Sequence, residues 1–215
     1  AHELGFEGLE YVNALYSDIT NSEDKASAME EFITRNNDLA AKYNLKNVLI
    51  MIDGEGDLAS SNPEERMIAV ENHKLWIDAA SKMNCSAIRI NLEGEKEIEN
   101  WIKYSVESFG ALGEYAKPLN INVIVENHGG LSSNASLLMK VINQVNLENC
   151  GTLPDFGNFC MSEGYGSLKE NNCKDLYDPY LGISEMLPKA FGLSAKSYAF
   201  DSNGDETTLD YYRLL

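Results

Sequence analysis

Glu126 and His128 carry two side chains whose types and spacing suit proton or metal chemistry. They lie two residues apart at the end of the apolar run 121–125, directly before Gly129 and Gly130. If a strand continues through both residues, their side chains point to the same face of its sheet. A carboxylate and an imidazole on one inward face can bind a hard divalent cation or act as a proton-transfer pair. The alternative is structural, with His128 hydrogen-bonded at the turn that precedes the two glycines.

Other apolar runs also end in polar residues, and that shared position is typical of an active site. The residues concerned are Asp53 and Glu55, Arg89 with Asn91, Asp155 with Asn158, and finally Lys196. A parallel sheet closes either as an open doubly wound sheet or as a (β/α)8 barrel, and in both its chemistry collects at the carboxyl ends of the strands. One such residue could be a solvated loop group, but five consecutive strand ends are harder to explain in that way.

The elements that must position these residues alternate along the chain. Short apolar, β-branched runs begin near residues 8, 47, 86, 121, 150 and 193, the last two being weaker, and helical stripes cover 29–43, 68–83, 101–116 and 137–145. This order predicts an α/β fold with buried parallel strands. Asn62 and Pro63 predict the N-cap and first turn of the second helix. No Gly-x-Gly-x-x-Gly follows a run, which disfavours a dinucleotide site, and we expect residues 1–215 to form a single domain.

The charge of the chain excludes several classes of partner. Its 215 residues include 17 Lys and Arg against 34 Asp and Glu, a formal charge of −17. Such a chain would repel phosphate backbones and anionic membrane surfaces. With 44% apolar residues it is too hydrophobic to be disordered, and no apolar run approaches the ~20 residues that span a bilayer. We therefore expect a soluble, acidic globular protein with neither a nucleic-acid nor a membrane partner.

Buried packing roles are expected for three residues that could otherwise suggest chemistry. Cys85 and Cys150 adjoin apolar runs, and His73 lies in mid-helix beside Trp76. The four cysteines include no Cys-x-x-Cys pair, and nothing indicates a disulfide framework. A reducing compartment, and so a cytoplasmic location, is the default expectation. A segment preceding Ala1 could nevertheless hold an export signal.

Three motifs resemble one family. Residues 125–130 read Val-Glu-Asn-His-Gly-Gly, residues 154–159 read Pro-Asp-Phe-Gly-Asn-Phe, and residues 194–201 read Ser-Ala-Lys-Ser-Tyr-Ala-Phe-Asp. Together they resemble the xylose isomerase-like TIM barrels, often described as sugar phosphate isomerases or epimerases. The resemblance spans nearly the whole chain and implies an incomplete (β/α)8 TIM-barrel-like fold with about six βα units. By this alignment the first strand would precede Ala1 and the last would follow Leu215.

The same resemblance implies a divalent metal ion, one of Mn, Mg, Co or Zn. Family members commonly hold it with a Glu, an Asp, a His and a second Glu from the last four strands. Glu126 matches the first Glu and Asp155 the Asp. The usual His position holds Ser194, and the final Glu would lie beyond Leu215. His128 could supply a replacement nitrogen.

The function implied by the resemblance is isomerisation or epimerisation of a sugar or sugar phosphate, by metal-assisted proton abstraction next to a carbonyl. Glu126 would be ligand and base, and His128 an acid, a base or a ligand. Lys196 would stabilise the developing oxyanion. The expected substrate-binding residues are Arg89, Asn91, Asn158 and Glu55.

Two alternatives remain open. One is a lyase that begins with the same proton abstraction and then expels a leaving group from an oxidised sugar or glycoside. The other is a sugar-binding barrel that has lost its metal and is not an enzyme. The DNA-repair branch of the family is disfavoured, because its three-zinc site is rich in histidine and this chain has three. The expected partner is a small carbohydrate, with self-association left open.

Overall fold

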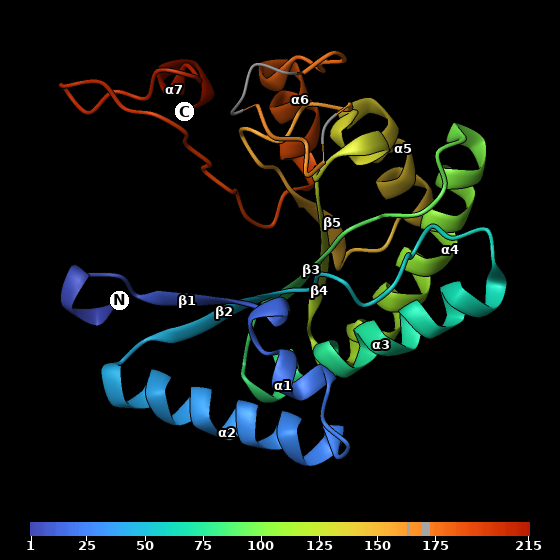
Figure 1. The fold of residues 1–215 in the computed structure, drawn as a ribbon, viewed down its shortest axis with the longest axis vertical. Helices are drawn as coiled ribbons and strands as arrows, with labels where there is room; N and C mark the ends of the chain where they lie inside the picture. Colours follow the sequence, from blue (N-terminus) through green and yellow to red (C-terminus); the bar gives the residue numbers. More distant parts are fainter. Residues whose placement is uncertain (163, 169–172) are drawn as a thin grey trace.

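Five parallel strands form one sheet in sequential order in the computed structural model, which describes residues 1–162, 164–168 and 173–215. The strands are β1 (Gly8–Val12), β2 (Lys46–Met51), β3 (Ala87–Ile90), β4 (Asn122–Glu126) and β5 (Cys150–Leu153). The helices are α1 (Ser17–Thr20), α2 (Lys25–Tyr43), α3 (Pro63–Lys82), α4 (Ile98–Ala116), α5 (Ala135–Val145), α6 (Pro179–Met186) and α7 (Tyr211–Leu214). Helices α2 to α6 follow one another around the outer side of the sheet (Figure 1). The arrangement is part of a (β/α)8 barrel, as predicted.

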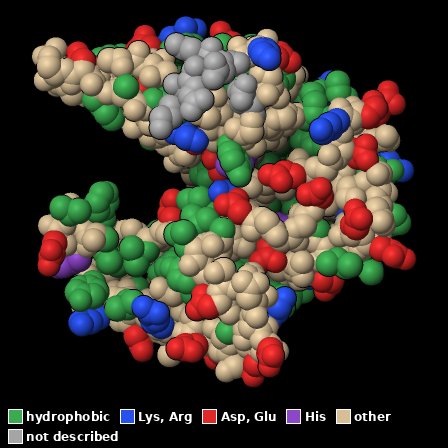
Figure 2. Space-filling view, viewed as in Figure 1, with side chains coloured by type: hydrophobic (Ala, Val, Ile, Leu, Met, Phe, Trp, Pro, Cys, Tyr) green, Lys and Arg blue, Asp and Glu red, His purple; other side chains and the backbone are tan. Residues whose placement is uncertain are grey.

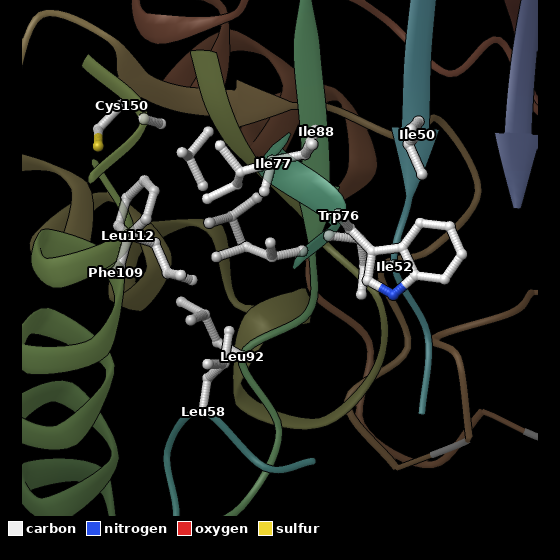
Figure 3. Close-up of a cluster of buried hydrophobic side chains, with 14 of the residues drawn as sticks. Ile50, Ile52, Leu58, Trp76, Ile77, Ile88, Leu92, Phe109, Leu112 and Cys150 are labelled. Atoms are coloured by element: carbon white, nitrogen blue, oxygen red, sulfur yellow. The ribbon is translucent and has the colours of Figure 1, made fainter. Parts of the chain in front are cut away.

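The two faces of the sheet bury different sets of side chains. On the outer face, residues such as Ile50 and Ile88 pack against Trp76, Ile77 and other helix residues in the main core (Figure 3). On the inner face a second, smaller cluster forms a floor from Leu49, Ala87, Ile124 and Leu153. Side chains two residues further along each strand point to the same inner face. The polar strand ends therefore stand directly above an apolar floor.

Helix boundaries agree with the sequence signals. Asn62 caps α3, its Oδ1 accepting from the Glu64 backbone N–H at 3.0 Å, and Pro63 occupies the first turn. Asn134 caps α5 in the same way. Helix α4 ends at Ala116, where the short 3₁₀ turn Lys117–Leu119 begins. The four predicted helical stripes are confirmed.

The weak run near residue 193 does not form a sixth strand within the described residues. It follows β5 only through single parallel bridges, Thr152 with Ala190 and Asp155 with Ser194. Leu193 is half exposed, and the segment has few of the β-branched residues that fit a buried strand. The chain then runs away from the sheet to the short helix α7 (Figure 1).

The cysteines depart partly from expectation. Cys85 and Cys150 are free and buried, as predicted. Cys160 and Cys173, however, form a disulfide with their Cα atoms 5.6 Å apart, a pairing that the sequence did not indicate. Their separation of 13 residues carries no local motif, and only the folded loop after β5 brings them together. No helix in the described parts of the chain has the length and hydrophobicity to cross a bilayer.

We expect Cys173→Ser to lower the free energy of unfolding by about 3 kcal/mol, because the disulfide restricts the unfolded chain over a loop of this length. In a protein of this size that loss corresponds to a fall in Tm of about 6 °C or more. Thermal unfolding should show the same fall when the wild-type protein is reduced. The variant, in contrast, should not respond to reductant. A wild-type Tm that is insensitive to reduction would contradict this expectation.

Candidate functional site

The Arg89 guanidinium lies at the centre of the inner face and is 4% exposed. Its Nη1 is 2.6 Å from Asp53 Oδ1, and its Nε is 2.9 Å from Glu126 Oε2. Because β3 lies between β2 and β4, one side chain from β3 reaches acidic groups from both neighbours. A buried cation is tolerated only when it is paired in this way. Asp53, which sequence reasoning placed at a strand end without a role, is therefore a structural partner of the site.

The carboxyl groups of Glu126 and Asp155 come together from neighbouring strands. Leu153 pairs with Glu126 across the sheet, so Asp155 follows on the same inner face. A hydrogen bond links the two carboxyl groups. Glu126 Oε1 also accepts from Asn158 Nδ2 at 3.1 Å, and Asp155 Oδ2 accepts from the Ser194 hydroxyl at 2.6 Å. Both carboxyl groups are thus held from more than one side.

Burial raises the pKa of Glu126 to about 7, and the negative charge of Asp155 adds to the rise while Arg89 opposes it. Burial also raises the pKa of Asp155, against the effects of Lys196 and of its hydrogen bonds. Two adjacent buried carboxyl groups cannot both ionise freely, so they titrate as a pair. The pair can therefore exchange a proton near neutral pH.

Two amides and a lysine complete this arrangement. Lys196 Nζ donates to Asn158 Oδ1 at 2.7 Å, and its charge lowers the pKa of both carboxyl groups. The Asn127 side chain accepts from the Asp155 backbone N–H at 2.7 Å and donates to the carbonyls of Asp155 and Asn158. Sequence reasoning missed Asn127. It lies one residue past Glu126 with opposite strand parity, which offered no signal of a role in the site.

His128 lies outside β4, which ends at Glu126. Its buried Nδ1 has no hydrogen-bond partner within the described residues, and its ring lies 5.0 Å from that of Tyr165. The turn bond that sequence analysis considered is made by the His128 backbone N–H, which donates to Ser132 Oγ at 3.0 Å. Burial and the charge of Arg89 lower the pKa of His128 to about 4, so the ring is neutral at physiological pH.

Asn91 joins the same centre, since its Nδ2 donates to Asp53 Oδ1 at 2.8 Å. Glu55 stands apart: its Oε1 accepts from Trp76 Nε1 at 2.8 Å and from Asn13 Nδ2 at 3.1 Å. It lines a neighbouring cavity of about 430 Å³, here called the acidic pocket, formed by Ala14, Ile52, Asp53, Gly54, Glu55, Gly56, Asp57, His73, Asn91, Glu93 and Tyr165. The structure therefore gathers seven of the eight predicted site residues at the centre and places Glu55 in the adjoining pocket.

A divalent metal ion does not fit the described residues by themselves. Glu126 and Asp155 offer carboxylate oxygens, but no cluster of three His, Cys, Asp or Glu side chains able to hold a metal occurs among residues 1–162, 164–168 and 173–215. Ser194 uses its hydroxyl hydrogen on Asp155. Arg89 and Lys196 already counter the two carboxylates, so an entering dication would meet two resident cations. We derive no chemical step through a metal.

Comparison with known proteins gives the family. The model of the xylose isomerase-like TIM barrel family matches residues 1–191, and the chain belongs to that family. No curated protein sequence matches the chain.

Solved structures show the same fold. A D-allulose 3-epimerase from Methylomonas sp. superposes with a TM-score of 0.71 at 14% identity, over 100% of this chain and 70% of that one. A xylose isomerase domain protein from Planctomyces limnophilus gives 0.68 at 18% identity, over 93% and 67%. An AP endonuclease of family 2 from Brucella melitensis gives 0.66 at 18% identity, over 100% and 78%. At these identities the likeness establishes the fold.

We expect the Glu126 carboxyl to titrate with a midpoint of about 7 when followed by ¹³C NMR. Asp155→Asn removes the neighbouring negative charge and should lower that midpoint, whereas Glu148→Gln, remote at the amino end of β5, should not change it. Because the folded-state pKa lies above that of the unfolded chain, ionisation of Glu126 costs stability, and stability should fall as pH rises from about 4.5 to 7. A midpoint near the ordinary 4.5 would contradict the burial argument.

Ser194→His should create the third metal donor that the described residues lack. Ser194 Oγ lies 2.6 Å from Asp155 Oδ2, so an imidazole at this position can share an ion with both carboxylates. We expect calorimetry to show Mn²⁺ or Zn²⁺ binding at least about tenfold tighter than in the wild-type protein. Ser197→His, three residues further along, is the control and should leave affinity unchanged. Equal affinity of Ser194→His and the wild-type protein for Mn²⁺ or Zn²⁺ would contradict the placement of residue 194 beside the two carboxyl groups.

Proposed function

We propose that this protein is an isomerase or epimerase that acts on a sugar or sugar phosphate by removing a proton next to its carbonyl group. The observation that carries the proposal is the contact between the Glu126 and Asp155 carboxyl groups, with the pKa of Glu126 at about 7 and Lys196 nearby. A general base works best when its pKa lies near the operating pH. Several proteins of the same fold are named as epimerases of D-tagatose, D-psicose or D-allulose, which supports this choice.

In this proposal the ionised Glu126 removes the proton, and the C–H bonding electrons move into an enediolate. Lys196 and the Arg89 guanidinium stabilise the negative charge that develops on the carbonyl oxygen. Return of the proton to the adjacent carbon isomerises the sugar. Delivery to the same carbon from the opposite face, with His128 as a second proton carrier, epimerises it. Asn91 and Asn158 would hold substrate hydroxyls beside these groups.

The metal assistance that the family resemblance implies remains outside the proposed steps, because the described residues do not complete a site. The lyase and the non-catalytic sugar-binding barrel, which the sequence analysis left open, predict different experimental results. A lyase would share the first proton abstraction and then lose a leaving group. A sugar-binding barrel without catalysis would bind sugar and exchange no proton.

The test is incubation of D-fructose, D-tagatose and D-psicose with the protein in D₂O, followed by NMR. Deuterium on the carbon next to the carbonyl, in an otherwise intact sugar or its epimer, is the expected result. Glu126→Gln should lower the exchange rate by about 10²–10⁴-fold, because the base is removed. Glu148→Gln is the matched control, with the same change of charge away from the site.

Release of a leaving group from an oxidised glycoside, in place of exchange, would favour the lyase. Binding of these sugars without exchange would favour the sugar-binding barrel. Exchange that persists in Glu126→Gln at the wild-type rate would overturn the assignment of Glu126 as base.

A further inference from the structure

The acidic pocket adjoins the carboxyl pair but differs from it in charge. Asp53 and Asn91 belong to both, and Tyr165 lines the pocket while contacting the His128 ring. Among the described residues that line it there is no Lys or Arg, and four of them carry carboxylates. Asp and Glu side chains also outnumber Lys and Arg over the face of the molecule that Figure 2 shows. A ligand that reached from Glu126 into this pocket would pass from a site where Arg89 and Lys196 counter the carboxylates into one lined by carboxylates alone.

The nearest guanidinium cannot offset this charge. Arg89 is already shared between Asp53 and Glu126. Lys196 donates to Asn158 on the far side of the centre. The side chains of Asp57 and Glu93 have no ion-pair partner among the described residues, and the charges of Asp57 and Asp53, after burial, raise the pKa of Glu93. Asp53 is thus paired with Arg89, whereas the carboxylates of Glu55, Asp57 and Glu93 have no ion pair with any described residue.

His73 presents a hydrogen-bond acceptor to this pocket. Its side chain is 2% exposed, and its Nδ1 lies 2.7 Å from the Ala69 carbonyl oxygen on the same helix. A carbonyl can only accept, so Nδ1 carries the hydrogen and Nε2 carries a lone pair. Burial lowers the pKa of His73, which keeps the ring neutral. Nε2 has no hydrogen-bond partner among the described residues, and its ring lines the cavity.

Asn91 supplies a second acceptor without a partner. Asn91 Nδ2 donates a hydrogen bond to Asp53, and this bond sets the orientation of the amide group, including its oxygen Oδ1. That oxygen is fully buried and has no hydrogen bond within the described residues. A buried acceptor left without a donor is costly unless a ligand supplies one. Glu55 Oε2 is a third free acceptor, since Trp76 and Asn13 both bind Oε1.

We propose that the acidic pocket binds the hydroxyl-bearing end of an unphosphorylated sugar, with Glu55, His73 and Asn91 accepting its hydroxyl hydrogens, and that it rejects a phosphorylated end. The proposal rests on the proposed function and narrows it, since the substrate could otherwise be a sugar or a sugar phosphate. A hydroxyl donates to each free acceptor. A phosphate dianion offers acceptors only and meets carboxylates without a countercharge. His73 is thereby a binding residue, in addition to the buried packing residue that the sequence predicted.

The experiment uses the imidazole nitrogens as reporters. The chain has three histidines, so long-range ¹H–¹⁵N spectra can follow His73 and His128 separately during titration with D-fructose, D-fructose 1-phosphate and D-fructose 6-phosphate. D-fructose should shift the His73 Nε2 signal. D-fructose 6-phosphate, whose phosphate lies at the end remote from the carbonyl, should bind at least about tenfold more weakly, whereas D-fructose 1-phosphate, whose phosphate lies beside the carbonyl, should still shift the His73 signal. Asp57→Asn with Glu93→Gln removes two pocket charges whose side chains make no hydrogen bond to described residues. This double variant should reduce the difference in binding affinity between the sugar and the sugar phosphate, whereas Glu148→Gln should leave that difference unchanged.

Glu55→Gln sharpens the test without disturbing the fold. The glutamine carbonyl can still accept from Trp76 and Asn13, while its NH₂ replaces the free acceptor that faces the pocket. We expect it to weaken binding of D-fructose about tenfold or more. D-fructose 6-phosphate binding as tightly as D-fructose, or a preference for D-fructose over its 6-phosphate that the double variant leaves unchanged, would overturn the inference.

The outcomes separate this inference from the proposed function. If D-fructose shifts His128 and undergoes deuterium exchange while His73 does not respond, the pocket is not the subsite, but the proton chemistry stands. If D-fructose shifts neither ring and exchanges no proton, the proposed function fails, and the inference fails with it.

Discussion

The buried guanidinium of Arg89 is the interaction on which the site depends. It stands on the middle strand of the five and pairs with Asp53 after β2 and with Glu126 at the end of β4. Removing either partner would leave charge buried without compensation, which is far more costly than an exposed ion pair is valuable. The same pairing limits how much positive charge remains for other groups. Burial raises the pKa of Glu126 although Arg89 opposes the rise, and Glu55, Asp57 and Glu93 line the acidic pocket without an ion pair among the described residues.

The inner face of the sheet changes from apolar to polar toward the carboxyl ends of the strands. Leu49, Ala87, Ile124 and Leu153 form the floor. Arg89, Glu126 and Asp155 follow two residues after the last three of these, whereas β2 continues with the apolar Met51 and reaches Asp53 four residues after Leu49. The floor excludes water from below, so the groups above it interact in a medium less polar than water. That position explains why burial is the largest influence on the pKa values of Glu126, His128 and Asp155. The strand parity that builds the core thus also sets the proton chemistry.

Periodicity and strand parity made much of this predictable. Local sequence patterns predict the buried strands, the helical stripes and the Asn62 cap. In a parallel sheet, the side chains at the carboxyl ends of the strands must lie along the same edge. The disulfide of Cys160 and Cys173 depends on a loop closing in space, and no local spacing indicates it. The free nitrogen of His73 depends on which ring atom meets the Ala69 carbonyl, a detail that a helical stripe cannot contain. Asn127 likewise acts through backbone groups that only the fold brings near.

The two halves of the site impose an orientation on any sugar that enters. A carbonyl oxygen is an acceptor and gains most beside Lys196 and Arg89, where negative charge can develop. Hydroxyl groups can donate and gain most beside Glu55 and His73, whose unpaired atoms are acceptors. A polyhydroxy aldehyde or ketone carries a carbonyl group at one end and hydroxyl groups at the other. When the hydroxyl groups bind in the acidic pocket, the carbonyl end is directed to the carboxyl pair. Binding energy from the remote hydroxyls can thereby position the carbon whose proton Glu126 removes.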